Sequence, residues 1–390
     1  MKNHLSSNRH ASSGFSLIEL MIALVLGLLI MAAVVQLFIG SRQTYSTNEA
    51  LARVQENGRF AMEFIKPEIR GVISGRGFCA GEFTPTVHLD LSCDDSMAAV
   101  FDPAGAILGW EYEDTGDGDE FSIPENLDPD GIDDDLWGRR RGGQQLPLPS
   151  PLVDRVVPGS DVIVIRQNEI LPVEIDGVQS GNRIRVTSGG DQIPAQGIMM
   201  VVNCSLGIDI FQGTRGSSGD LMKPSQNCQQ GGQPGNRPPG QSPWSTEQHD
   251  ESSTVIRHST VAFYIGWNAA RQEPGLYRMD MTAGLGNLVI EELVEGIENM
   301  QILYGFSRPE AAGGDGQSVD DWLTASEVPD WGLVIAVRIA MLARSQTNAD
   351  PRAESFTFDL LGTQLTTPSD RRLRQPFTTT LAIRNQVLVM

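Results

Sequence analysis

The arrangement of apolar and polar positions divides the chain into three regions. Residues 15–39 form a nearly unbroken apolar stretch, interrupted only by Ser16, Glu19, Gln36 and small residues. Between residues 43 and 66, apolar positions recur three and four residues apart, which is typical of one face of a helix. Beyond residue 71, short runs rich in β-branched residues are separated by Gly, Pro, Asn and Asp. We therefore predict an apolar helix, an amphipathic helix and a β-rich body.

The first two regions predict one long helix that begins in a membrane. At ~1.5 Å per residue, the apolar stretch would be roughly 37 Å long, enough to cross a hydrocarbon core of ~30 Å. Lys2 and Arg9 precede it, so we expect the N-terminus to stay cytoplasmic and the rest to face the other side. Pro67 is expected to end or kink the amphipathic part near residue 66. The apolar stripe of this part consists of Leu51, Val54, Gly58, Ala61 and Ile65.

The body is predicted to be an antiparallel sheet packed on the helix, which makes the fold class α+β. The sequence lacks the alternation of strands and helices that a doubly wound nucleotide-binding fold requires. Residues 293–299 are predicted as a short helix or turn that leads into a strand. Residues 111–141, which are acidic, and 213–252, which are rich in Gly, Pro, Ser and Gln, are predicted loop insertions that contribute little to a core. The predicted strands are 161–166, 171–175, 183–187, 198–203, 208–212, 260–266, 276–279, 300–306, 333–343, 355–361 and 377–384.

Glu19 is the exceptional residue of the apolar stretch. A carboxylate in a membrane helix costs ~2.5–3.5 kcal/mol on insertion scales, so it requires a compensating cation. If the chain is cut between Gly14 and Phe15, the new ammonium at Phe15 lies one turn from Glu19, at the helix end whose dipole also favours negative charge. In an assembly, the same carboxylate could neutralise the amine of a neighbouring subunit. The alternative is an uncleaved signal anchor that happens to contain a Glu.

Composition narrows the function of the body. The 390 residues include 49 Asp+Glu against 29 Lys+Arg, and the formal charge of −20 would become −22 on loss of residues 1–14. Such a charge repels phosphate backbones, so we expect no nucleic-acid partner. His88, His249 and His258 are the only imidazoles beyond residue 14, and no hydrolase, zinc-protease or phosphate-loop motif accompanies them. We therefore predict no enzymatic activity and no catalytic residue, and we interpret His88 and His249 as surface residues.

The four cysteines are disulfide candidates, because an exported body meets an oxidising periplasm. Their spacing and the few histidines argue against a zinc site. Three pairings are possible, and the one that joins neighbours in the sequence closes the shortest loops. Four free thiols are the alternative. The residues are Cys79, Cys93, Cys204 and Cys228.

The acidic insertion raises the question of a metal cofactor. Its carboxylates and Gly turns could supply hard oxygen ligands to Ca²⁺, but the residue order of a twelve-residue EF-hand loop is not met. A solvated acidic loop is the simpler interpretation, so we expect no cofactor and keep Ca²⁺ as the alternative. The candidate ligands are Asp114, Asp117, Asp119, Asp128, Asp130 and Asp133.

Residues 14–20, with the sequence GFSLIEL, resemble the class III signal of type IV pilins. The resemblance implies a leader over residues 1–14, cut between Gly14 and Phe15 by a membrane aspartyl prepilin peptidase. It also implies N-methylation of Phe15 and a docking role for Glu19 in subunit assembly. The implied organisation is a transmembrane and filament-core helix over 15–40, its amphipathic continuation over 41–70, and a periplasmic head over 71–390.

Scattered blocks of the body resemble the PilW family of minor pilins. The blocks are residues 264–265, 276–278, 293–304, 334–345 and 381–385. The resemblance implies a subunit of low abundance that helps to start and cap a type IV pilus. The implied partners are other minor pilins, the major pilin, prepilin peptidase and a PilY-type tip adhesin. The implied location is the inner membrane before assembly and the pilus at the cell surface afterwards.

Two other functions share parts of this pattern. A type II secretion pseudopilin, most like the J-type tip component, has the same leader, helix and β-rich head. An adhesive or calcium-binding module displayed on a pilin stem would use the two insertions for binding. Gene neighbours would separate the first of these from a pilus subunit, and calcium titration would test the second.

Overall fold

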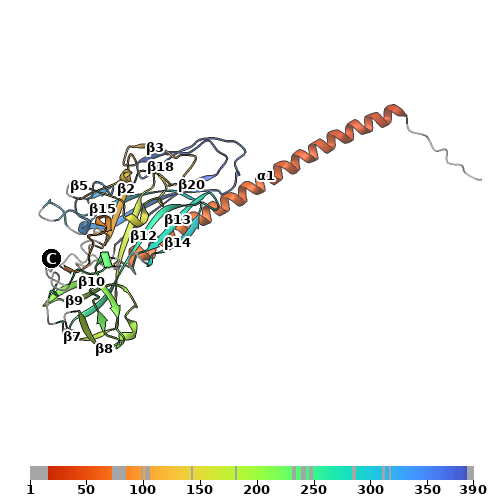
Figure 1. Cartoon of the computed structure of the whole chain (residues 1–390). Coiled ribbons are helices and arrows are strands. Elements are labelled where there is room, and N and C mark those ends of the chain that lie inside the picture. Colours follow the sequence, from red (N-terminus) through yellow and green to blue (C-terminus); the bar gives the residue numbers. More distant parts are fainter. Residues whose placement is uncertain are drawn as a thin grey trace, which may run out of the picture.

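The computed structural model describes residues 16–72, 85–97, 100–101, 106–141, 144–180, 182–230, 234–238, 243–245, 249–282, 287–309, 312–315 and 318–383. In this part of the chain, one α-helix, α1 (Leu17–Arg70), projects far beyond a head made of β-strands (Figure 1). Its 54 residues span about 81 Å at ~1.5 Å per residue. The predicted α+β, pilin-like architecture is thereby confirmed.

The helix α1 is continuous across the boundary between its apolar and amphipathic parts. Ser16 caps its start, because the Ser16 hydroxyl accepts a hydrogen bond from the Glu19 backbone N–H (3.2 Å). The prediction that Pro67 ends or kinks the helix near residue 66 is wrong for the end point, since α1 continues to Arg70. Pro67 lies in the final turn, and the Gly71 N–H donates to the Pro67 carbonyl (2.8 Å) to close the helix end.

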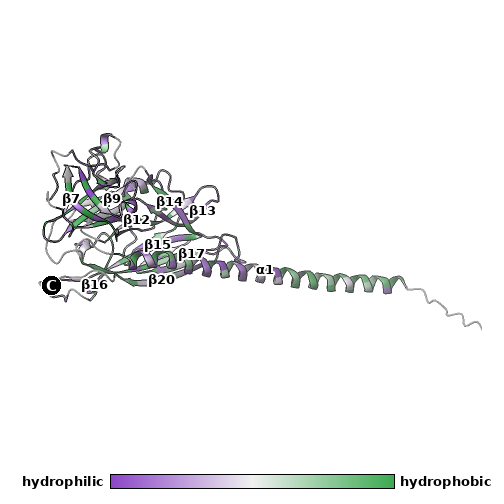
Figure 2. Ribbon diagram, turned by 90° about the horizontal axis from the view of Figure 1, so that it is seen from below, coloured by the Kyte–Doolittle hydropathy of each residue, from purple (hydrophilic) through white to green (hydrophobic). Residues whose placement is uncertain are grey.

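The two halves of α1 have different surroundings. The first half protrudes and exposes its large apolar side chains, from Leu17 (78%) to Leu37 (72%), and it is largely green in Figure 2. It is long and apolar enough to cross a membrane, and none of its most apolar window is buried. Polar residues appear where the helix reaches the head (Figure 2). The free apolar surface therefore belongs to the protruding half.

The second half of α1 packs on the head with one face. The stripe predicted from the sequence is buried at Val54, Gly58, Ala61 and Ile65, whereas Leu51 is exposed. At Gly58 the ring of Phe377 occupies the space that a Cβ atom would need, so the absence of a side chain lets the helix lie directly on the sheet. The other buried residues of this face are Ala50, Met62 and Ile69.

Most strands of the head belong to one large sheet. Its central strand, β12 (Thr254–Asn268), pairs antiparallel with β6, β9 and β13. Strands β7 to β10 gather in a lobe at the end of the head away from the protruding helix (Figure 1). The other strands of this sheet are β1 (Thr86–Val87), β2 (Ile107–Tyr112), β4 (Trp137–Arg141), β5 (Gln144–Leu146), β6 (Val162–Ile170), β7 (Glu174–Ser180), β8 (Arg183–Ser188), β9 (Gly197–Asn203), β10 (Gly207–Arg215), β11 (Leu221–Met222), β13 (Glu273–Asp280) and β14 (Val289–Glu295).

Two smaller sheets complete the head. A four-stranded antiparallel sheet has the order β16-β15-β17-β20, and α1 packs mainly on its edge strand β20 and on β17. A three-stranded sheet has the order β18-β19-β3. Their strands are β15 (Ile297–Phe306), β16 (Asp321–Leu323), β17 (Val334–Arg344), β20 (Arg374–Ala382), β3 (Glu120–Ser122), β18 (Thr357–Leu360) and β19 (Thr363–Thr366). Short 3-10 turns lie at Asp95–Met97, Asp134–Leu136, Ser150–Leu152, Gly190–Gln192, Cys228–Gln230 and Trp331–Leu333.

Three predictions about the body are wrong. Residues 293–299 are not a helix or turn but the end of β14 and the start of β15, joined at Gly296 with φ of 74°. The acidic insertion contributes Leu127 and Trp137 to the main core, because its apolar residues fold inward. The insertion 213–252 contributes Trp244 to a second core in the distal lobe.

Candidate functional site

The predicted processing and assembly residues lie at the free end of α1. Gly14 and Phe15 fall outside the described residues. Glu19 is the only charged residue between Leu17 and Ser41, and it lies in the first helical turn. Its side chain is exposed and makes no hydrogen bond or ion pair with any residue that the structure describes. The end of the helix therefore presents one unpaired carboxylate on an apolar rod.

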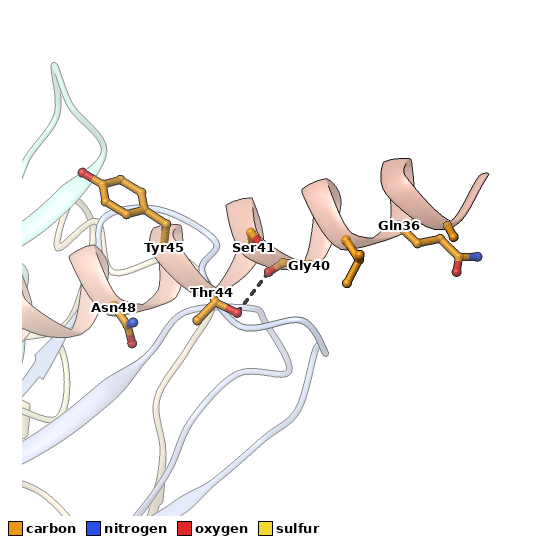
Figure 3. A pocket seen from close by; sticks show the side chains of 8 residues that line it. Gln36, Gly40, Ser41, Thr44, Tyr45 and Asn48 are labelled. Atoms are coloured by element: carbon orange, nitrogen blue, oxygen red, sulfur yellow. Dashed lines mark hydrogen bonds between the residues drawn. The ribbon is translucent and has the colours of Figure 1, made fainter. Parts of the chain in front are cut away.

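A groove lies on α1 where the helix leaves the head (Figure 3). The Thr44 hydroxyl donates to the Gly40 carbonyl (3.0 Å), which turns this polar group back onto the helix. All of the lining residues belong to α1, so the groove is a surface of the helix and not a cleft between elements. They are Ala33, Gln36, Leu37, Gly40, Ser41, Thr44, Tyr45 and Asn48, a set without a metal-binding or general-base side chain.

An acidic cavity of about 590 Å³ lies beside β2. Burial raises the pKa of Glu111. Burial also holds the pKa of Asp161 well above its usual range, and the negative charge of the neighbouring Glu111 raises it further. The Asp161 carboxylate accepts hydrogen bonds from the backbone N–H groups of Ile302 (2.8 Å) and Tyr112 (3.4 Å). The acids that line the cavity are Glu111, Glu113, Asp114, Asp117, Asp119, Asp135 and Glu327.

The structure separates the six predicted calcium ligands into two groups. Asp114, Asp117 and Asp119 line the acidic cavity, but Asp128, Asp130 and Asp133 do not. The carboxylates of Asp128 and Asp133 accept hydrogen bonds from the backbone N–H two residues on, which is ordinary turn formation. Among the described residues, no group of three or more His, Cys, Asp or Glu side chains is placed to hold a metal ion.

The distal lobe contains a buried polar cluster, formed by His88, Asp209, Lys223 and His249, that the sequence does not predict. The interpretation of His88 and His249 as surface residues is wrong, because both are fully buried. Each Nε2 atom lies 2.6 Å from a different carboxylate oxygen of Asp209 on β10. Lys223 Nζ lies 3.1 Å from His88 Nδ1 and 4.1 Å from the centre of the Trp244 ring. The sequence separations of 121 and 40 residues between the histidines and Asp209 gave no local signal.

The polar cluster is built for holding segments together. Burial alone would raise the pKa of Asp209, but hydrogen bonds from His249, His88 and Ser245 hold it well below its usual range. Burial lowers the pKa of Lys223 to about 8. The Ser245 hydroxyl donates to Asp209 directly, so the order Ser–His–Asp that activates a nucleophile is not formed. The cluster ties three chain segments to β10.

The described cysteines are oxidised. Cys93 and Cys228 form a disulfide with Cα atoms 6.0 Å apart, and Cys204 is also disulfide-bonded. The pairing that would close the shortest loops, Cys79–Cys93 with Cys204–Cys228, is therefore not adopted. The fold brings two residues that are 135 positions apart next to each other, which loop length cannot reveal. Cys79 lies outside the described residues.

Two family models match the chain, one at each end of the architecture described above. Residues 9–35 match the prokaryotic N-terminal methylation motif, and residues 262–385 match the family of Type IV Pilus-assembly protein W, PilW. The second match contains the strands on which α1 mainly packs, β14, β17 and β20. No curated protein and no solved structure matched the chain. Over the residues that they cover, the two matches confirm the resemblance to PilW minor pilins with a prepilin-type N-terminus.

Proposed function

We propose that this chain is a minor pilin that takes part in initiating and assembling type IV pili, within a tip or priming complex with other minor pilins. The observation that carries the proposal is the protruding half of α1, an apolar rod with one carboxylate, Glu19, in its first turn. The methylation motif over residues 9–35 coincides with this rod. The PilW match covers the C-terminal part of the head, which includes β17 and β20, the strands on which the helix mainly packs.

Processing would occur at the cytoplasmic end of the rod. Prepilin peptidase would cut between Gly14 and Phe15, and the new amine of Phe15 would be methylated. The Glu19 carboxylate would then lie one turn from that amine, at the positive end of the helix dipole. Before assembly the apolar half would be held in the inner membrane with the acidic head in the periplasm.

Assembly would replace lipid by protein around the same rod. An unpaired carboxylate in an apolar environment is unfavourable, so Glu19 favours positions in which it meets the N-terminal amine of a neighbouring subunit. This pairing would fix the axial register of the subunits, while apolar packing supplies the affinity. The head would present loops and strand edges to other minor pilins, the major pilin and a PilY-type tip protein.

The proposal is tested on the full chain in its native cell. We expect mass spectrometry of the purified protein to find a mature N-terminus at Phe15 carrying one methyl group. We expect Gly14→Ala to block cleavage, and Glu19→Ala to be processed but absent from sheared pili. Glu49→Ala is the matched control, because Glu49 is an exposed carboxylate of the same helix near the head.

Two outcomes would contradict the proposal. Retention of residues 1–14 in the wild-type protein would leave it a simple membrane anchor. Wild-type chain that is processed but never recovered with sheared pili, and that is required for secretion of folded proteins, would instead identify a type II secretion pseudopilin.

A further inference from the structure

Exposed polar and charged side chains lie on α1 where the helix leaves the head. The apolar rod, from Leu17 to Ile39, is followed by Arg42 and Tyr45, which are both exposed, Tyr45 by 72%. Among the residues that the structure describes, Arg42 forms no ion pair. Figure 3 shows Tyr45 at this level of the helix, where it lines the polar groove. The rod is therefore followed directly by a cation and an amphipathic aromatic ring.

A loop of the head is fixed beside the same part of α1. Residues 345–356 join β17 to β18. The Ala349 carbonyl accepts hydrogen bonds from Gln43 Nε2 (3.2 Å) and from the Thr47 hydroxyl (2.8 Å). Arg352 follows Ala349 by three residues, and its side chain is 81% exposed. The fold therefore brings a second arginine to the place where the rod ends, from a segment about three hundred residues away in the sequence.

We refer to Arg42, Tyr45 and Arg352 together as the collar, and its position matches the headgroup region of a membrane. The rod from Leu17 to Ile39 would span about 34 Å at ~1.5 Å per residue, which is enough to cross a hydrocarbon core of ~30 Å. Arg42 and Tyr45 follow within ~9 Å along the helix axis, where the headgroups of that membrane would lie. Tyr is enriched in this zone, and long Arg side chains extend into it.

Charge favours anionic lipid as the partner of the collar. The 49 acidic residues of the chain outnumber its 29 basic ones, so a negatively charged membrane repels the head as a whole. Arg352 lies 3.8 Å from Glu354, but exposed pairs of this kind are weak, so its guanidinium stays available to a phosphate. A guanidinium can bind two oxygens of one phosphate group at once. The two arginines of the collar therefore provide a local attraction on an otherwise repelled body.

We propose that the collar binds the phosphate groups of anionic phospholipids at the periplasmic surface of the membrane before the subunit is assembled. This inference rests on the proposed function, in which the inner membrane holds the rod. The hydrogen bonds to the Ala349 carbonyl couple the loop to α1, so lipid bound at Arg42 and Arg352 acts on helix and head together. The collar thereby fixes which side of the acidic head meets the membrane.

The inference is tested on the full chain in lipid nanodiscs that contain phosphatidylglycerol and phosphatidylcholine. We expect native mass spectrometry of the released protein to find phosphatidylglycerol retained in preference to phosphatidylcholine. The double variant Arg42→Gln with Arg352→Gln should retain at least about fivefold less phosphatidylglycerol, since one basic residue near a charged membrane contributes about that factor. Its retention of phosphatidylcholine should be unchanged.

The double variant Arg53→Gln with Arg257→Gln is the matched control. It removes the same charge from exposed positions, Arg53 further along α1 and Arg257 on β12, and should retain lipid like the wild type. Equal losses in both double variants, no loss in either, or no lipid preference in the wild type would overturn the inference. Displacement of phosphatidylglycerol by inorganic phosphate would identify a general anion site and would overturn it as well.

Photocrosslinking gives an independent readout of where the loop lies. p-Benzoylphenylalanine in place of Ala353, which is exposed beside Arg352, should form adducts with lipid in the discs. The control position is Ile170, which is 57% exposed and precedes Leu171 of the second core, and it should form none. A chain that is inserted in the discs but gives no lipid adduct at position 353 would overturn the inference and leave the proposed function intact. A wild-type chain that is not membrane-inserted in its native cell would instead remove the proposed function itself.

Discussion

His258 is held neutral in the interior of the head. It lies on the central strand β12, only 3% exposed, and its Nδ1 lies 2.8 Å from the side-chain oxygen of Asn168 on β6. Burial lowers the pKa of His258 to about 3, and the nearby Arg166 charge acts in the same direction. Its Nε2 atom is buried and has no hydrogen-bond partner in the described part of the chain. Protonation of this ring is therefore unfavourable in the folded state.

The consequence is a loss of stability in mild acid. The unfolded chain takes up a proton at His258 near the ordinary pKa of ~6.5, whereas the folded chain resists it down to about pH 3. The buried neutral ring therefore costs no stability well above pH ~6.5. The free energy of unfolding declines as the pH falls from there toward 3. We expect His258→Gln to reduce the loss of unfolding free energy between pH 7 and pH 5 by about 2 kcal/mol. Denaturant unfolding of the full chain in detergent at the two pH values measures it.

Thr260→Val is the matched control for His258. Thr260 is two residues further along β12, equally buried, and does not titrate. Its variant should keep the wild-type difference between pH 7 and pH 5. An identical pH dependence in wild type and His258→Gln would show that this imidazole is not the group responsible.

Side-chain roles that depend on distant partners were the least predictable from the sequence. His88 and His249 lie in Gly-, Pro- or Asp-rich surroundings, which correctly suggest loops but wrongly suggest solvent. Their burial follows from Asp209, which sits on a strand that the sequence did identify. Glu19 was found because the apolar residues on both sides make one carboxylate conspicuous, whereas a carboxylate in an ordinary β-strand is not.

At the scale of elements, the contact between α1 and the four-stranded sheet depends on Gly58. Gly in a helix interior costs roughly 1 kcal/mol relative to Ala, so intrinsic propensity favours replacing it. The Phe377 ring fills the position of the missing Cβ, so packing opposes the replacement. We expect packing to prevail, with Gly58→Ala lowering the free energy of unfolding by about 1–3 kcal/mol, as overpacking usually does.

A double-mutant cycle separates the two effects at Gly58. Combining Gly58→Ala with Phe377→Ala should restore part of the loss, because the collision is then removed, and a coupling of at least about 0.5 kcal/mol is expected. Gly40→Ala is the control, since nothing lies within 4 Å of its added Cβ. A stabilised Gly58→Ala protein would mean that the helix does not rest on Phe377 in solution.

A helix or strand can be predicted from the sequence when its own residues determine it, and not when distant partners do. The helix was predictable over almost its whole length because a local apolar pattern needs no distant partner. Residues 333–343 were predicted close to β17 because they form a mostly apolar run that contains Val334, Ile335, Val337 and Ile339. Residues 293–299 are difficult to predict as strands because Glu and Asn are poor strand formers. Their strand state is imposed by distant partners, since the end of β14 pairs with β13 and the start of β15 pairs with β17. Pro67 does not mark the end of α1, because it lies in the final turn and the helix continues to Arg70.

At the scale of the molecule, a buried ion network joins the large sheet to the four-stranded sheet under α1. The Arg344 guanidinium at the end of β17 donates to Glu273 at the start of β13 and to Glu298 on β15, each at 2.8 Å. Arg372 also pairs with Glu273 (2.8 Å), and Arg374 with Glu298 (2.6 Å). Three arginines therefore surround two buried glutamates, and Arg344 joins β17 of the four-stranded sheet to β13 of the large sheet.

Removing Arg344 should weaken the whole head because two buried carboxylates lose a shared cation. We expect Arg344→Met to lower the free energy of unfolding by about 3 kcal/mol, near the lower end of the range for broken buried pairs, since Glu273 and Glu298 each keep one arginine. Arg338→Met, on the same strand, should cost less than about 1 kcal/mol because Arg338 stacks on Trp322 at the surface. If both variants lose the same stability in denaturant unfolding, the Arg344 bridge does not hold the two sheets together, and apolar packing between them does.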